Sequence, residues 1–227
     1  MGKSFVLIDV DFFNKEGLFV PQQLGFIEEN SKEVSITLAQ EDSLSGFDLY
    51  KCHYDKEINK RIKIGYDHFI NHYYDPTDFE LFYNEKLNLA VANAGNDLIR
   101  SFCEELNQTK YFKLKILPFD TNDILLRLDS INGLWISKIK EMNLESAGYF
   151  GPSVQKSERA QDILNGAGPE VSSFNAYFYS EYFGKDFSIL ISKKGSVVIH
   201  DYLSSTKDYI LFITELYDKL LKNSLIK

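Results

Sequence analysis

Residues 79–92 read Phe-Glu-Leu-Phe-Tyr-Asn-Glu-Lys-Leu-Asn-Leu-Ala-Val-Ala, and they open the stretch that decides the fold, which runs to residue 140. Residues 80–84 and 87–91 are short runs rich in residues that favour strands. From residue 94 the pattern changes to a helix with one apolar face, formed by Leu98, Ile99, Phe102, Cys103 and Leu106. A strand at 112–117, a helix after the capping residues 120–123 and a strand at 133–139 follow.

Further strands are predicted on both sides of this stretch, at 4–13, 34–38, 48–53 and 171–183, with a hairpin formed by 186–192 and 196–202. Residues 61–73 fit a strand better than a helix because β-branched and aromatic residues are frequent there. Residues 205–208, Ser-Thr-Lys-Asp, resemble a capping box that begins a C-terminal helix. The expected fold is α+β, with a mixed or largely antiparallel sheet and helices packed on one face.

The chain divides by composition into three parts. Residues 142–170 hold four of the 13 Gly and two of the five Pro, so this segment is predicted to be a mobile connection. It separates an N-terminal α+β core at 1–141 from a strand, hairpin and helix unit at 171–227. The 171–227 unit is expected to pack on the N-terminal core, and a single domain is the alternative.

Composition and charge narrow the class of protein. With 227 residues and 44% hydrophobic residues, the chain is long enough to bury a core without metals or disulfides, and two cysteines form no disulfide framework. No 18-residue apolar stretch is present, so we predict a cytoplasmic protein without a membrane partner. The net charge is −8, and residues 1–50 hold nine Asp and Glu against three Lys and Arg. That first quarter is expected to repel nucleic acid.

Asp9 and Asp11 are the candidate metal ligands. They end an apolar strand, and a spacing of two residues places both carboxylates on one face, about 7 Å apart. A divalent cation, Mg²⁺ or Mn²⁺, would bridge such a pair in metal-dependent phosphoryl chemistry. The alternative is an edge strand whose polar face is solvated and which needs no cofactor.

A set of basic residues forms the candidate nucleic-acid surface. Lysines alternate with apolar residues along two predicted strands, and two more basic residues follow in the Gly-rich connection. The set consists of Lys110, Lys113, Lys115, Lys138, Lys140, Lys156 and Arg159. If they converge, they offer a basic surface with aromatic neighbours, which suits a phosphate backbone. The alternative is that these lysines protect a sheet edge.

The order of strands and helices in part of the chain resembles that of the phage-exclusion, or abortive-infection, proteins of the Rex type. The segments that carry this resemblance are Leu87–Arg100, Phe112–Pro118 and Ile131–Ile136. In that family a core of alternating strands and helices precedes a C-terminal strand and helix unit. The resemblance covers about the last two thirds of the chain. It implies a cytoplasmic, self-associating protein, and some members of the family bind DNA.

The sequence contains no local motif for nucleophilic catalysis, and no catalytic residue is predicted. The expected function is that of a phage-defence binding protein that acts by self-association and by binding nucleic acid. A metal-dependent phosphoesterase or nucleotide-processing enzyme based on Asp9 and Asp11 is the first alternative. The second is an acidic inhibitor or adaptor that binds a basic protein.

Overall fold

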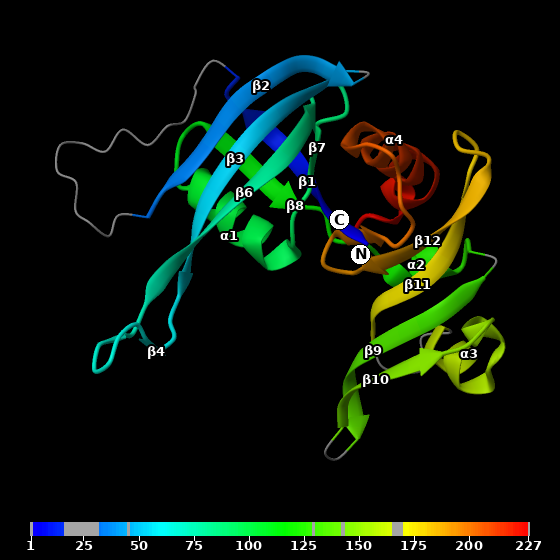
Figure 1. Cartoon of the computed structure of the whole chain (residues 1–227). Coiled ribbons are helices and arrows are strands. Elements are labelled where there is room, and N and C mark those ends of the chain that lie inside the picture. Colours follow the sequence, from blue (N-terminus) through cyan, green and yellow to red (C-terminus); the bar gives the residue numbers. More distant parts are fainter. Residues whose placement is uncertain are drawn as a thin grey trace. The chain divides into compact units, whose positions relative to one another are not determined.

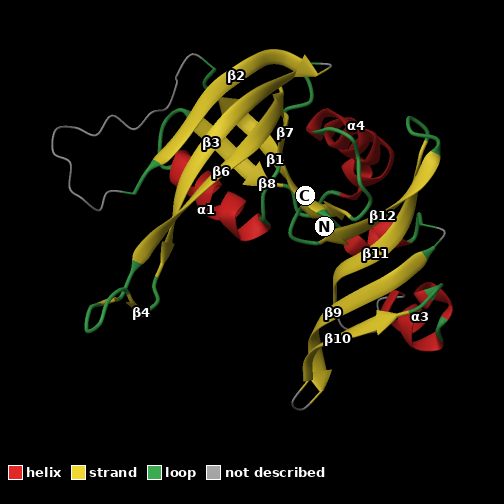
Figure 2. Cartoon of the chain, viewed as in Figure 1, coloured by secondary structure: helices red, strands yellow, loops and turns green. Residues whose placement is uncertain are grey.

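The computed structural model describes residues 2–15, 32–44, 46–128, 130–141, 144–164 and 170–226. Strands dominate these residues, and helices are few (Figure 2). The chain forms two compact units: one consists of Ile8–Lys115, and the other of Met1–Leu7 together with Ile116–Lys227. The compact units divide between Leu7 and Ile8 and between Lys115 and Ile116. The division expected at residues 142 and 171 stays a prediction.

The unit formed by Ile8–Lys115 is built around long antiparallel strands (Figure 1). Its strand order is β1-β7-β6-β3-β2, and β8 pairs with β1. The elements are β1 (Lys3–Phe13, shared with the other unit), β2 (Val34–Leu44), β3 (Phe47–Ile58), β4 (Ile62–Lys63), β5 (Phe69–Ile70), β6 (Tyr73–Asn84), β7 (Leu89–Ala92), α1 (Asn96–Asn107) and β8 (Phe112–Ile116).

One face of this sheet is apolar because alternate residues of each strand point to the same side. Tyr54 of β3 and Phe79 of β6 are buried, and both rings meet Phe102 of α1 at centroid distances of 6.1 and 5.0 Å. Ile99, Phe102, Cys103 and Leu106 of α1 are buried, which confirms the apolar face predicted for this helix. The remaining alternate residues of β3 and β6 therefore point away from α1.

The second unit also contains a largely antiparallel sheet, in the order β10-β9-β11-β12-β13-β1. Its α4 helix begins at the predicted capping box, in which the Ser205 hydroxyl accepts the Asp208 N–H. The elements are α2 (Thr121–Leu125), β9 (Ile131–Glu141), β10 (Leu144–Phe150), η1 (Val154–Lys156), α3 (Glu158–Leu164), β11 (Glu170–Ser180), β12 (Lys185–Ser192), β13 (Ser196–Ile199), α4 (Thr206–Leu216), the π-helix η2 (Tyr217–Leu221) and η3 (Lys222–Ser224).

The two units share one local layout, in which a hairpin is followed by a helix. In the first unit Phe79 of the β6–β7 hairpin packs on Phe102 of α1, and in the second Phe187 of the β12–β13 hairpin packs on Phe212 of α4, 4.6 Å between centroids. All four rings are buried. The same arrangement of burial therefore occurs twice.

The predicted elements are largely present. The strands and helices expected between 79 and 140 correspond to β6, β7, α1, β8, α2 and β9, and the predicted hairpin corresponds to β12 and β13. Residues 61–73 form the small β4–β5 hairpin and the start of β6 rather than one strand. None of the described helices is long and apolar enough to cross a membrane.

Candidate functional site

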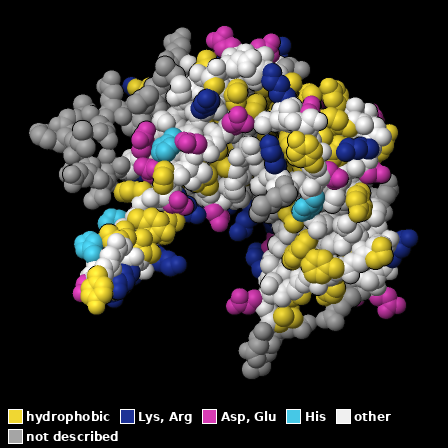
Figure 3. Space-filling model, viewed as in Figure 1, with side chains coloured by type: hydrophobic (Ala, Val, Ile, Leu, Met, Phe, Trp, Pro, Cys, Tyr) yellow, Lys and Arg dark blue, Asp and Glu magenta, His cyan; other side chains and the backbone are white. Residues whose placement is uncertain are grey.

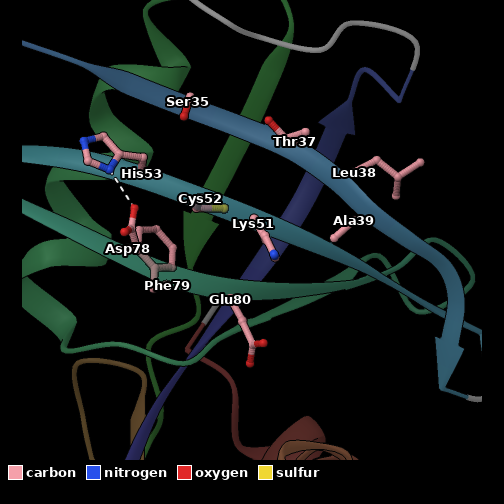
Figure 4. A pocket seen from close by; sticks show the side chains of 10 residues that line it. All are labelled: Ser35, Thr37, Leu38, Ala39, Lys51, Cys52, His53, Asp78, Phe79 and Glu80. Carbon is pink, nitrogen blue, oxygen red and sulfur yellow. Dashed lines mark hydrogen bonds and ion pairs between the residues drawn. The ribbon is translucent and has the colours of Figure 1, made fainter.

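The candidate site is an open, polar depression on the side of the β2-β3-β6 sheet that points away from α1 (Figure 4). It has a volume of about 730 Å³. On the visible surface over this region, histidine, acidic and basic side chains lie close together (Figure 3). The depression is lined by Ser35, Thr37, Leu38, Ala39, Lys51, Cys52, His53, Asp78, Phe79 and Glu80.

The strand register arranges the polar side chains of this depression in two rows that cross all three strands. In the first row Ser35 of β2 lies opposite His53 of β3, which lies opposite Asp78 of β6. The second row consists of Thr37, Lys51 and Glu80 in the same strand order. Because side chains on one face repeat every two residues, the two rows are neighbours.

His53 is held between two carboxylates. Its Nδ1 lies 2.7 Å from Asp78 Oδ1, and its Nε2 lies 3.2 Å from Asp55 Oδ1. The hydrogen bond to Asp78 is the main cause that raises the pKa of His53, and the bond to Asp55 adds to it against the opposing effect of burial. The imidazolium form is therefore favoured.

The Ser35, His53 and Asp78 row has the residue types of a catalytic triad but not its hydrogen bonds. In a triad the histidine uses one ring nitrogen for the carboxylate and the other for the nucleophile. Both ring nitrogens of His53 have carboxylate partners, Asp78 and Asp55. His53 is thus arranged to carry charge rather than to activate the Ser35 hydroxyl.

Lys51 and Glu80 lie directly opposite each other, yet they are not paired. The side chain of Lys51 is exposed, and it makes no ion pair within 4.0 Å in the described part of the chain. Both charges remain available to a ligand. The depression therefore presents three parallel stripes: hydroxyls on β2, the positive side chains Lys51 and His53 followed by Asp55 on β3, and carboxylates on β6.

The predicted metal ligands Asp9 and Asp11 lie on β1, outside the depression. Asp9 is half-buried and Asp11 is exposed. Within the described ranges, no group of three or more His, Cys, Asp or Glu side chains is arranged to hold a metal ion. A metal at this pair stays a prediction.

Two backbone hydrogen bonds bracket the pairing of β1 with β8. The Leu117 N–H donates to the Leu7 carbonyl at 2.9 Å, and the Asn14 N–H donates to the Tyr111 carbonyl at 3.0 Å. Residue numbers rise along β1 as they fall along β8. The two strands are therefore antiparallel.

Asp9 and Asp11 of β1 therefore lie on the strand next to that of Lys113 and Lys115. Lys113, Lys115 and Asp11 are exposed, and Asp9 is half-buried. The candidate metal ligands and two candidate nucleic-acid lysines thus lie on neighbouring strands.

The other predicted basic residues divide between the two compact units. Lys110 is exposed beside Tyr111, with its Nζ 5.4 Å from the ring centroid, in the same unit as Lys113 and Lys115. Lys138 and Lys156 are exposed in the other unit, where Lys138 pairs with Glu170 at 2.7 Å.

Two residues of that predicted set are not placed. The side chains of Lys140 and Arg159 lie outside the described residues. Convergence of the seven basic residues on one surface stays a prediction.

The residues that line the depression were not among the predicted site residues. His53 stands alone in the sequence, and an isolated histidine is usually structural. The sequence feature that indicates this site is the alternation of Lys51, His53 and Asp55 with buried residues on β3. Asp78 and Glu80 alternate with a buried residue on β6 in the same way. Pairing of β3 with β6, which joins these two patterns, depends on register and not on local sequence.

Comparisons with known proteins found no matching family model and no matching curated protein.

Proposed function

We propose that this protein acts by binding rather than by catalysis, and that self-association is its principal binding activity. One observation carries the proposal. The open face of β2, β3 and β6 displays charges of both signs in adjacent stripes, and its histidine is held by two carboxylates. Such a surface suits electrostatic recognition of another protein surface.

Sedimentation velocity tests this proposal over a range of protein concentrations. Association through charged surfaces shifts the protein to larger species as concentration rises, and higher salt reverses the shift because it screens exposed charges. A single monomeric species at every concentration and at low salt would contradict self-association.

Nucleic-acid binding is the second candidate function. The exposed side chains of Lys113 and Lys115 on β8, with Lys110 over the Tyr111 ring, support it. Asp9 and Asp11 on the neighbouring strand oppose it, since carboxylates repel phosphates. Titration of labelled single-stranded and duplex DNA at low salt tests it directly.

The resemblance to Rex-type proteins supports a role in phage defence for either binding activity. Plating phages on cells with and without the protein measures that role. Unchanged plaque numbers for all phages tested would remove the support.

A further inference from the structure

The charged depression has a pattern that is complementary to itself. Lys51 and His53 form a positive stripe on β3, which ends at Asp55, and Asp78 and Glu80 form a negative stripe on β6, about 4.8 Å away. Homo-oligomers are mostly two-fold dimers, in which the same patch of both copies meets. The symmetry axis decides which stripes face each other.

Two copies can stack these faces around a two-fold axis in either of two principal directions. An axis across the strands places β3 over β3 and β6 over β6, so that like charges meet. An axis parallel to the strands, between β3 and β6, exchanges the stripes and places each positive stripe over a negative one. Only the second arrangement is electrostatically favourable.

We infer that this face binds a second copy of the chain in the second arrangement, with Lys51 over the second copy's Glu80 and His53 over the second copy's Asp78. The contact follows from register, because Lys51 shares a row with Glu80 and His53 shares a row with Asp78. The inference rests on the proposed self-association and names its surface and its register.

The unpaired state of Lys51 and Glu80 within one chain supports this partner. These two side chains face each other across neighbouring strands and form no ion pair within 4.0 Å in the described residues. Neither side chain is therefore held by the other within one chain. His53 is already oriented by Asp55 and Asp78, so its position is fixed before binding.

Complementary charge reversal tests the inference. Lys51→Glu and Glu80→Lys, each alone, place like charges over each other at two symmetry-related points. We expect each variant to weaken self-association by about thirtyfold, because the two-fold axis places the same unfavourable contact at two points of the dimer. An equimolar mixture of the two variants restores opposite charges at both points, and association is expected to return to within a fewfold of the original protein.

Lys86→Glu is the matched control, because Lys86 is an exposed lysine in the β6–β7 turn, away from the depression. It is expected to leave association unchanged, and thermal melts of all variants establish that they fold.

The possible failures are distinguishable. No association of the unaltered protein would overturn the proposed function itself. Association that Lys51→Glu leaves unchanged would overturn this surface alone, and weakening by both variants without recovery in the mixture would overturn the proposed register.

Discussion

His53 of β3 and Asp78 of β6 form a cross-strand pair whose Nδ1 to Oδ1 distance is 2.7 Å, on the side of the sheet opposite Phe102. The two residues are 25 positions apart in the sequence. Asp55 completes the arrangement from the same strand as His53. Three ionisable side chains therefore interact with one another on this sheet face. Their contribution to the stability of the fold depends on pH.

Stability should fall as His53 loses its proton. The pKa of His53 is raised in the folded protein, chiefly by Asp78, so its contribution is fully present below the unfolded value of about 6.5. The contribution is lost as the pH rises through the folded pKa. His53→Gln should cost about 1 kcal/mol at pH 5.5 and little at pH 9, measured by urea unfolding.

His200→Gln is the control for that experiment, since His200 is an exposed histidine for which no ion pair is found among the described side chains. Equal losses for His53→Gln at pH 5.5 and pH 9 would show that the ion pairs do not contribute.

The lysines of β8 should contact phosphates if the protein binds DNA. Replacing Lys113 and Lys115 together by Gln is expected to reduce the slope of log K against log salt by about two units. Asp9→Asn with Asp11→Asn should strengthen the same binding, because both carboxylates lie on the neighbouring strand and repel phosphates. Fluorescence anisotropy at several salt concentrations measures both effects, and an unchanged slope for the lysine variant would show that these lysines do not contact phosphates.

Mg²⁺ or Mn²⁺ should stabilise the protein if Asp9 and Asp11 hold a divalent cation, because two carboxylates on one strand face can share it. The cation is then expected to raise the melting temperature of the original protein, and Asp9→Asn is expected to abolish the rise. Identical melting curves with and without metal in both proteins would favour a solvated strand face.

Phe102 and Phe212 should contribute similar amounts to the stability of the fold. Both side chains are fully buried and pack on a phenylalanine of the preceding hairpin. Truncation of either to Ala should cost about 3–5 kcal/mol by loss of burial and creation of a cavity. Tyr202→Ala, at a side chain that is 81% exposed, should change stability by less than about 0.5 kcal/mol in the same denaturant titration.

Gly195 should not tolerate a side chain. Its φ is +88°, and a Cβ there would overlap the Leu117 carbonyl oxygen and the Ile116 side chain. Gly184 has a φ of +65° with open space around it, so Gly184→Ala isolates the backbone strain, about 1 kcal/mol. Gly195→Ala should cost clearly more than Gly184→Ala, and equal melting temperatures would contradict this close contact.

The sequence predicted local elements well because their signals are local. The apolar face of α1 and the capping box of Ser205 and Asp208 could be identified within about a dozen residues. The candidate site could not be found in this way, because it depends on Lys51 and Glu80 meeting across β3 and β6. Likewise, β1 and β8 are neighbours through a pairing of residues far apart in the sequence, which local sequence patterns do not reveal.

The repeated hairpin and helix carry different outward side chains in the two units. Beside the Phe79 and Cys52 row of one unit lie His53 and Asp78, and beside the Phe187 and Phe178 row of the other lie Tyr179 and Asp186. Both units contain a buried ring contact, while the outward row pairs histidine with aspartate in one unit and tyrosine with aspartate in the other. A substitution at His53 or Tyr179 is therefore expected to alter the surface and to leave the ring contact beneath it in place.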